Sequence, residues 1–171
     1  MVYINLNNLK LKTFTEQDAE DYCLLNNLIP ENIIELDLSV NELTDISGIK
    51  IFKNLKELWL YHNKITDISV LNNLKKLKEF YLGNNNIKNL IIIKNLKSLK
   101  SLGLSNSKLT DISFISNLHN LEYLYIDNLQ LDSNQYKYIK SLKKLKYLYC
   151  GNGFKDMNIT NQFNKNITII K

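Results

Sequence analysis

The sequence predicts an α/β solenoid of about six repeats, with a parallel sheet on the concave side and 3₁₀ or short helical segments on the convex side. Apolar residues recur every 22 residues, each repeat contains an alternating strand pattern, and a helical stretch precedes the first repeat. We expect residues 1–171 to form a single domain. Within it, residues 1–32 form an N-terminal cap, 33–144 the regular repeats, and 145–171 a degenerate last repeat and C-terminal cap.

Eight positions stay in phase through four consecutive repeats. The repeats begin at Ile33, Leu55, Leu77 and Leu99, each 22 residues after the last. In the second of them the eight positions are Leu55, Leu58, Leu60, Asn63, Ile65, Ile68, Leu71 and Leu74. Such a period is typical of repeat architectures, in which neighbouring units bury a continuous core.

The C-terminal repeats depart from this pattern. The fifth repeat, from Leu121, has 24 residues, and the insertion favours a true α-helix capped by Asp132 or Ser133. The sixth repeat begins at Leu145 and decays. We expect the residues 167–170 to form a closing strand.

The N-terminal residues predict a cap over the first repeat. A helix is expected to begin at Thr15, to run to about Asn27, and to be stopped by Pro30. An open solenoid end would expose core, and this helix would shield it. Leu6, Leu9 and Leu11 suggest a degenerate strand before the helix.

The repeat pattern L-x-x-L-x-L-x-x-N-x-I-x-x-I-x-x-L-x-x-L resembles the 22-residue class of leucine-rich repeats. That class includes the Sds22-type phosphatase regulators and the bacterial internalins, and the segment 65–74 (ITDISVLNNL) is especially similar to internalins. The resemblance covers residues 33 to about 150 and implies a right-handed leucine-rich-repeat solenoid. It does not fix a function, because one scaffold serves many partners.

Polar residues at two repeat positions have structural roles. The turn after the strand carries Asn41, Asn63 and Asn85, whose amides are expected to form a ladder that Ser107 can partly continue. The convex segments are preceded by Asp45, Asp67 and Asp111, which are expected to accept backbone N–H bonds.

Side chains that alternate with the inward leucines are expected to line the concave face. The candidate partner-binding residues are Glu35, Asp37, Glu57, Trp59, Tyr61, Glu79, Tyr81, Gly103, Tyr123, Tyr125, Tyr147 and Tyr149. They comprise seven aromatic residues, four carboxylates at the N-terminal end, and a glycine. Ser101, Gly103 and Ser105 predict a shallow notch, flanked by Trp59 and Tyr81 on one side and by Tyr123 and Tyr125 on the other.

Two interpretations of this face are open. Tyrosines on adjacent strands can simply stack on one another and stabilise the sheet. Binding is favoured, because sheet stability requires neither a tryptophan nor a row of carboxylates. The expected partner is a protein or peptide with a basic segment, whose cation packs on Trp59 or Tyr81 close to Glu57 and Glu79.

The net charge of +5 raises nucleic acid as a second kind of partner. All 22 basic residues are lysines, and they are expected on the rims and the convex side. Lysine lacks the bidentate fork with which arginine recognises phosphate, so nucleic acid is disfavoured. An Sds22-like phosphatase regulator and a lysine-rim nucleic-acid-associated protein remain as alternatives.

The sequence gives little support for catalysis, and we expect no enzyme activity, cofactor or metal. Its two histidines are His62, at the concave exit, and His119, in a convex loop. A lone surface histidine is more often a rim residue than a general base. Cys23 and Cys150 match no metal spacing and are expected in the core.

The first eleven residues lack the pattern of a signal peptide, and no apolar run is long enough to span a bilayer. We therefore expect an intracellular, cytoplasmic protein that does not associate with membranes. A monomer is favoured.

Overall fold

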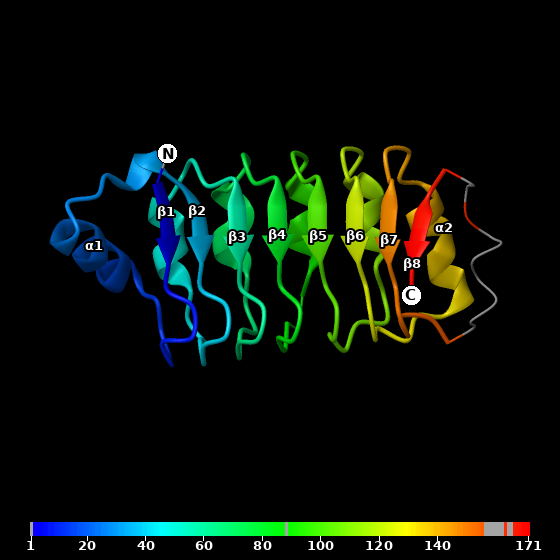
Figure 1. Cartoon of the computed structure of the whole chain (residues 1–171), viewed down its shortest axis with the longest axis horizontal. Coiled ribbons are helices and arrows are strands. Elements are labelled where there is room, and N and C mark those ends of the chain that lie inside the picture. The colour runs from blue at the N-terminus through cyan, green and yellow to red at the C-terminus, as the bar shows by residue number, and fades with distance from the viewer. Residues whose placement is uncertain (1, 88, 156–162, 164–165) are drawn as a thin grey trace.

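The computed structural model of the chain describes residues 2–87, 89–155, 163 and 166–171. Within these residues, one parallel sheet of eight strands runs the length of the molecule, with the strands in chain order from β1 to β8 (Figure 1). The strands are β1 (Val2–Asn5), β2 (Ile33–Asp37), β3 (Glu57–Trp59), β4 (Glu79–Tyr81), β5 (Ser101–Gly103), β6 (Tyr123–Tyr125), β7 (Tyr147–Tyr149) and β8 (Thr168–Ile170). The predicted solenoid is confirmed.

Short helical segments lie behind the sheet and return the chain from one strand to the next (Figure 1). Four repeats use 3₁₀ segments of five residues each, namely Ser47–Ile51, Ser69–Asn73, Ile91–Asn95 and Ser113–Asn117. The fifth repeat instead has the predicted α-helix, α2 (Tyr136–Lys140), after a 3₁₀ turn at Ser133–Gln135. No side chain caps either segment, so the predicted cap by Asp132 or Ser133 is wrong. The carboxylate of Asp132 instead pairs with Lys155 Nζ at 2.9 Å.

The apolar repeat positions form one continuous core between the sheet and the convex segments. One inward residue of each strand from β2 to β7 is fully buried, and these residues pair across the sheet in the row Leu36, Leu58, Phe80, Leu102, Leu124 and Leu148. Cys23 and Cys150 belong to the same core, as predicted, and both are free thiols. Burial raises the pKa of both thiols, that of Cys150 to about 11, so neither is a thiolate at neutral pH.

The asparagine ladder is present at its three predicted positions. Asn63 accepts a bond from the Leu43 N–H at 3.0 Å and donates to the carbonyls of Leu38 and Leu60, each at 3.0 Å. Asn41 and Asn85 make the equivalent bonds in their repeats. The ladder satisfies buried backbone groups that the turns leave open. Among the described residues, Ser107 adds no rung to it.

The convex segments begin as predicted. Asp45, Asp67 and Asp111 each accept a bond at 2.8 Å from the backbone N–H of the serine two residues later. In the third repeat, where the aspartate is replaced, Asn89 accepts the equivalent bond from the Ile91 N–H at 2.9 Å.

The N-terminal cap is a helix, α1 (Glu16–Leu25), that shields the first repeat at one end of the molecule (Figure 1). Thr15 and Asp18 form a reciprocal capping box at its start. The helix ends at Leu25, before Pro30, because Asn27 turns the backbone to a φ of 53°. The predicted stop at Pro30 is therefore wrong.

The first strand also differs from its prediction. Strand β1 lies at Val2–Asn5, before the expected span of Leu6–Leu11, and pairs with β2. Positive φ angles of 55° at Asn8 and 57° at Lys10 turn the chain, and Leu9 is 54% exposed.

At the other end, β8 closes the sheet on β7, as predicted for residues 167–170. Most of the predicted C-terminal cap between these strands lies outside the described residues. No helix in the described part of the chain has the length and apolar character that crossing a membrane requires.

Candidate functional site

The parallel register brings the outward side chains of the strands into two straight columns. Each strand from β2 to β7 contributes one residue to each column. The first column contains Glu35, Glu57, Glu79, Ser101, Tyr123 and Tyr147. The second contains Asp37, Trp59, Tyr81, Gly103, Tyr125 and Tyr149. We call the surface that carries both columns the concave face.

An aromatic row runs along the second column. The rings of Trp59 and Tyr81 are stacked with centroids 6.2 Å apart, and those of Tyr125 and Tyr149 with centroids 4.2 Å apart. Tyr81 and Tyr125 meet edge to face at 5.8 Å, which joins the two pairs across β5. In the first column, Tyr123 and Tyr147 form a separate stack at 5.0 Å. The stacking that the sequence suggested is thus present, and it holds the rings in fixed positions.

Strand β1 extends the aromatic row with a residue that the sequence analysis missed. Tyr3 meets Trp59 edge to face at 6.4 Å, and its side chain is half exposed. The alternation of Val2 and Ile4, both turned toward the core, was the signal that a strand lies here.

The carboxylates of the first column are neighbours, and Lys56 and Lys78 act on Glu57 only from a distance, favouring its charged form. Glu57 stands opposite Glu35 on one side and Glu79 on the other. Partial burial, and then repulsion by these two carboxylates, raises the pKa of Glu57. Among the described residues, no lysine forms an ion pair with any of the three.

Asp37 differs from the other three carboxylates because its oxygens are already engaged. It is only 9% exposed, and it accepts bonds from Asn7 Nδ2 at 3.0 Å, from the Ser39 N–H at 2.9 Å and from the Ser39 hydroxyl. These bonds tie the residues after β1 to the end of β2. Asp37 therefore offers little free carboxylate to a partner.

The predicted notch is present in part. The ring of Tyr81 leans over Gly103, and its hydroxyl contacts Ser101 Oγ at 2.9 Å and Glu79 Oε2 at 3.1 Å. Ser101 is consequently only 4% exposed. Gly103 and Ser105 line the hollow that is present, with Tyr81 and Tyr125 as flanks, as predicted, whereas Ser101 and the expected flanks Trp59 and Tyr123 lie outside it.

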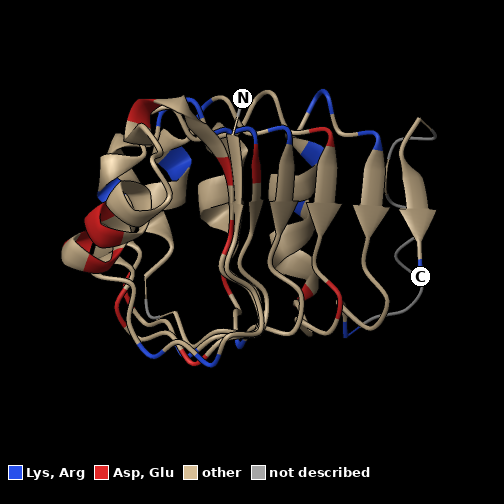
Figure 2. Cartoon of the chain, turned by 60° about the vertical axis from the view of Figure 1, so that its left-hand side comes forward, with Lys and Arg blue, Asp and Glu red and all other residues tan. Residues whose placement is uncertain are grey.

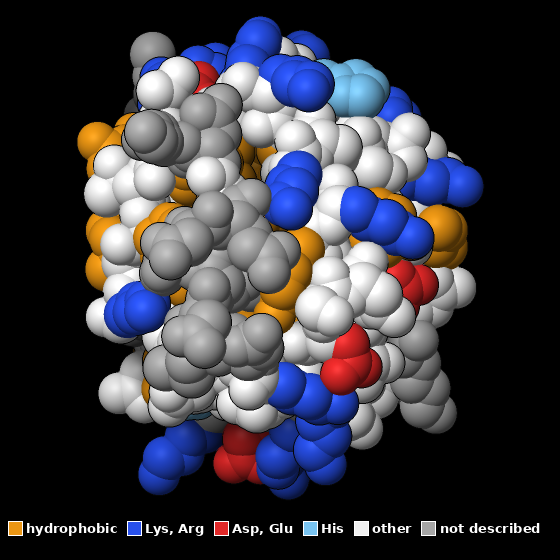
Figure 3. All heavy atoms as spheres, turned by 90° about the vertical axis from the view of Figure 1, so that its right-hand side faces the viewer, with side chains coloured by type: hydrophobic (Ala, Val, Ile, Leu, Met, Phe, Trp, Pro, Cys, Tyr) orange, Lys and Arg blue, Asp and Glu red, His pale blue; other side chains and the backbone are white. Residues whose placement is uncertain are grey.

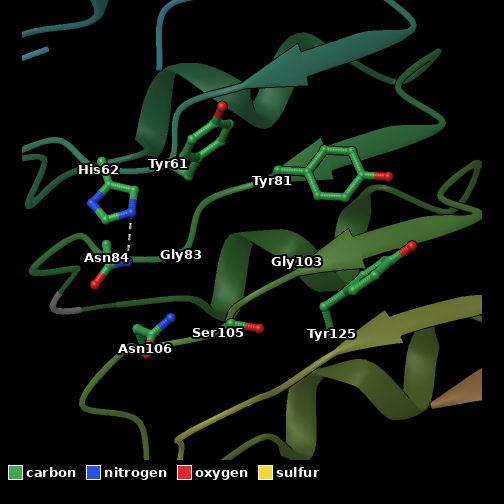
Figure 4. A pocket seen from close by; sticks show the side chains of 9 residues that line it. All are labelled: Tyr61, His62, Tyr81, Gly83, Asn84, Gly103, Ser105, Asn106 and Tyr125. Carbon is green, nitrogen blue, oxygen red and sulfur yellow. Dashed lines mark hydrogen bonds between the residues drawn. The ribbon is translucent and has the colours of Figure 1, made fainter. Parts of the chain in front are cut away.

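The hollow extends from Gly103 and Ser105 toward the carboxyl ends of the neighbouring strands. It has a volume of about 340 Å³, and we call it the Tyr81 pocket. Its lining residues are Tyr61, His62, Tyr81, Gly83, Asn84, Gly103, Ser105, Asn106 and Tyr125. In Figure 4, tyrosine rings form one side, the polar side chains of His62, Asn84 and Asn106 form the other, and the glycines lie between.

Hydrogen bonds hold the polar rim of this pocket. Asn84 Nδ2 and His62 Nε2 are 3.0 Å apart, and Asn128 Nδ2 donates to Asn106 Oδ1 at 2.7 Å. All four residues have φ between 55° and 60°, a left-handed conformation that asparagine tolerates well. His62 lies at the rim, as the sequence predicts, but the pocket that this rim borders is evident only in the fold.

The lysines lie mainly away from the two columns. Figure 2 shows carboxylates on the N-terminal strands and lysines along the loops at the edges of the sheet. Some lysines are paired locally, as Lys64 is with Glu42 at 2.7 Å, and Lys100 with Glu122 at 3.5 Å. Lysines are also spread over the C-terminal end of the molecule (Figure 3). Within the described residues, no cluster of histidine, cysteine and carboxylate side chains is suited to hold a metal ion.

Comparison with known protein families supports the assignment of the repeats. The family described as Leucine Rich repeats (2 copies) matches the chain over residues 31–73, 53–96 and 97–138. None of the curated protein sequences matches the chain significantly.

Solved structures show the same fold. An internalin (inlC2) from Listeria monocytogenes is 26% identical, with a TM-score of 0.74 over 99% of this chain and 79% of that one. A leucine-rich-repeat protein from Leptospira interrogans is 29% identical, with a TM-score of 0.74 over 98% of this chain and 41% of that one. A second Listeria internalin (inlF) is 28% identical, with a TM-score of 0.72 over 81% of this chain. The chain spans only 41% of that internalin.

Proposed function

This chain belongs to the leucine-rich-repeat family of protein-interaction modules, and from that premise we propose that its concave face binds a basic segment of a partner protein and catalyses no reaction. The proposal concerns the exposed residues of the two columns. It names the chemistry of the partner and leaves its identity open.

The observation that carries the proposal is the position of two carboxylates, neither of them in an ion pair among the described residues, beside a stacked ring pair. Glu57 and Glu79 are opposite one another on β3 and β4, and Trp59 and Tyr81 are opposite one another two residues further along. A lysine or arginine placed here would gain ion-pair contacts with the carboxylates and a cation–π contact with a ring. It would also relieve the mutual repulsion that raises the pKa of Glu57.

The distribution of lysines supports a protein partner over nucleic acid. A phosphate backbone requires a continuous basic surface. Here the lysines are divided between the edges and ends of the sheet (Figures 2 and 3), while the concave face carries carboxylates and rings. Such a face complements a cationic peptide.

Selection from a random twelve-residue peptide library on the immobilised chain tests the proposal. We expect the selected sequences to be enriched in lysine or arginine. A double variant, Glu57→Gln and Glu79→Gln, should lose this enrichment, because the amides keep the shape of the surface without its charge. Trp59→Ala should weaken the selected peptides about tenfold or more, as expected for a central aromatic contact.

Glu42→Gln is the matched control. Glu42 is an exposed carboxylate that already pairs with Lys64, and it lies outside both columns. This variant should select the same basic peptides as the original chain. Enrichment of acidic or uncharged peptides, or binding that survives Trp59→Ala unchanged, would show that the proposal is wrong.

A further inference from the structure

We infer that the Tyr81 pocket receives an apolar side chain from the same partner segment, so that the segment carries a lysine or arginine and an apolar residue about four positions apart in an extended conformation. This inference rests on the proposed function and specifies the partner that it would take. The segment occupies two subsites, namely the cation subsite beside Trp59 and Glu79 and the Tyr81 pocket. Tyr81 links them, because its ring lines the pocket and stacks on Trp59, and its hydroxyl contacts Glu79.

The chemistry of the pocket suits an apolar side chain. Tyr81 and Tyr125 present ring carbons to it, since the Tyr81 hydroxyl points away toward Ser101 and Glu79 (Figure 4). Gly83 and Gly103 place no side chain between the walls. The volume of about 340 Å³ lies near the lower end of the roughly 300–1,000 Å³ of ligand pockets, which suits one large side chain.

The polar rim favours a partner in extended conformation. The side-chain oxygen of Asn106, Oδ1, accepts a bond from Asn128 Nδ2. This bond fixes the orientation of the side-chain amide and leaves its nitrogen, Nδ2, as the donor that a partner can meet. An extended segment has unpaired backbone carbonyls that can accept such a bond, whereas the carbonyls of a helix are already used within the helix.

The separation of the two subsites sets the spacing. From Glu79 the chain runs through β4 to Gly83. The backbone hydrogen bonds between neighbouring strands continue to this point, since the His62 N–H donates to the Gly83 carbonyl at 3.0 Å. Four residues of extended chain span about 13 Å, and residues four apart project from the same side of a strand. An apolar residue four positions from the cation can therefore reach the pocket, while residues four apart on a helix are separated by only about 6 Å.

Titration of the ¹⁵N-labelled chain with defined peptides, followed by NMR, tests the inference. The parent peptide places one arginine and one leucine four positions apart in a twelve-residue glycine and serine background that does not form a helix. Three further peptides replace the leucine with serine, replace the arginine with glutamine, or place the two residues eight positions apart. The indole N–H of Trp59, the one tryptophan of the sequence, reports the cation subsite, and the amides of Gly83 and Gly103 report the pocket.

We expect the parent peptide to shift all three signals. Replacing its leucine with serine should weaken binding about tenfold and spare the response of Trp59. Tyr61→Ala, which removes one wall of the pocket, should weaken the parent peptide to a similar extent and leave the serine peptide unaffected. Tyr138→Ala is the matched control, because Tyr138 lies on α2 behind the sheet, outside both columns and the pocket lining, and it should change neither titration.

Two results separate failure of this inference from failure of the proposed function. Equal affinity of the parent peptide and either the serine peptide or the eight-position peptide overturns the inference alone. Equal affinity of the parent and the glutamine peptide shows that the cation contributes nothing, and it overturns the proposed function together with the inference.

Discussion

The ring of Tyr81 lies so close to Gly103 that a Cβ on Gly103 would come within 2.7 Å of Tyr81 Cδ1. The absence of a side chain at Gly103 on β5 is what allows Tyr81 on β4 to reach Tyr125 on β6. Gly103 is therefore the one position between Trp59 and Tyr149 in the second column that has no ring, and its lack of a side chain lets the rings on either side of it stay in contact.

Gly103→Ala should displace the Tyr81 ring and open the row at this point. Because Trp59, Tyr125 and two hydrogen bonds hold the obstructing ring in place, we expect a destabilisation of about 1–3 kcal/mol. Near-ultraviolet circular dichroism should weaken as the coupled rings separate, and basic peptides selected on the original chain should bind several-fold more weakly. Lys94→Ala, on the convex side, should have neither effect. An unchanged near-ultraviolet spectrum would contradict the expectation.

Asn63→Ala should destabilise the fold by about 2 kcal/mol. The substitution leaves the Leu43 N–H without an acceptor in a buried site, while the carbonyls of Leu38 and Leu60 each lose one of two bonds and keep the other from Asn41 and Asn85. Urea unfolding, with the slope held common to both proteins, measures the change. Asn120→Ala, in the loop before β6, is the control and should lose less than about 1 kcal/mol. A comparable loss at both positions would argue against the ladder.

Val40→Asn should stabilise the protein by about 1 kcal/mol. Val40 has a φ of 55°, like His62 and Asn84 at the same position of the next repeats, but a β-branched side chain is strained there. Its side chain is 43% exposed, so the substitution sacrifices little apolar burial. The melting temperature and the urea midpoint should both rise. Ile91→Asn, which changes another exposed apolar residue on the convex side, should not reproduce the gain.

The affinity for a basic peptide should increase with pH across the titration of Glu57. Burial and the neighbouring carboxylates raise its pKa in the free chain, and a bound cation would lower it. Binding then releases a proton, so affinity is full above the raised pKa and declines as pH falls through it. Fluorescence titrations of Trp59 between about pH 4 and 7.5 measure this dependence. Glu57→Gln should flatten the profile, and a profile that is unchanged in this variant would exclude Glu57 as its source.

The sequence predicted the repeats because parallel strands align residues that are 22 positions apart. The pairs Glu57 with Glu79, and Trp59 with Tyr81, follow directly from that spacing. Strand β1 was misplaced because it lies outside the period, in an N-terminal segment with a single short alternation. The tilt of Tyr81 over Gly103 was missed because a repeat position gives the direction of a Cβ, whereas the rotation of a ring depends on the space beside it.

Several statements made from the sequence stay predictions. They include the division into a cap at 1–32, regular repeats at 33–144 and a degenerate end at 145–171, and the role of the twelve concave residues in binding. Asp37 is the member of that set whose surroundings give the weakest reason to expect a contact, since its oxygens are already engaged.

The stacked rings also bear on the entropy of association. Trp59 and Tyr81, like Tyr125 and Tyr149, restrict each other's rotation within the folded chain. Ordering a mobile side chain at an interface costs about 0.5–1.5 kcal/mol, and these rings are already ordered before any partner arrives. A partner meeting this surface would lose its own freedom of motion while the surface would lose very little, which favours slow dissociation without any additional contact.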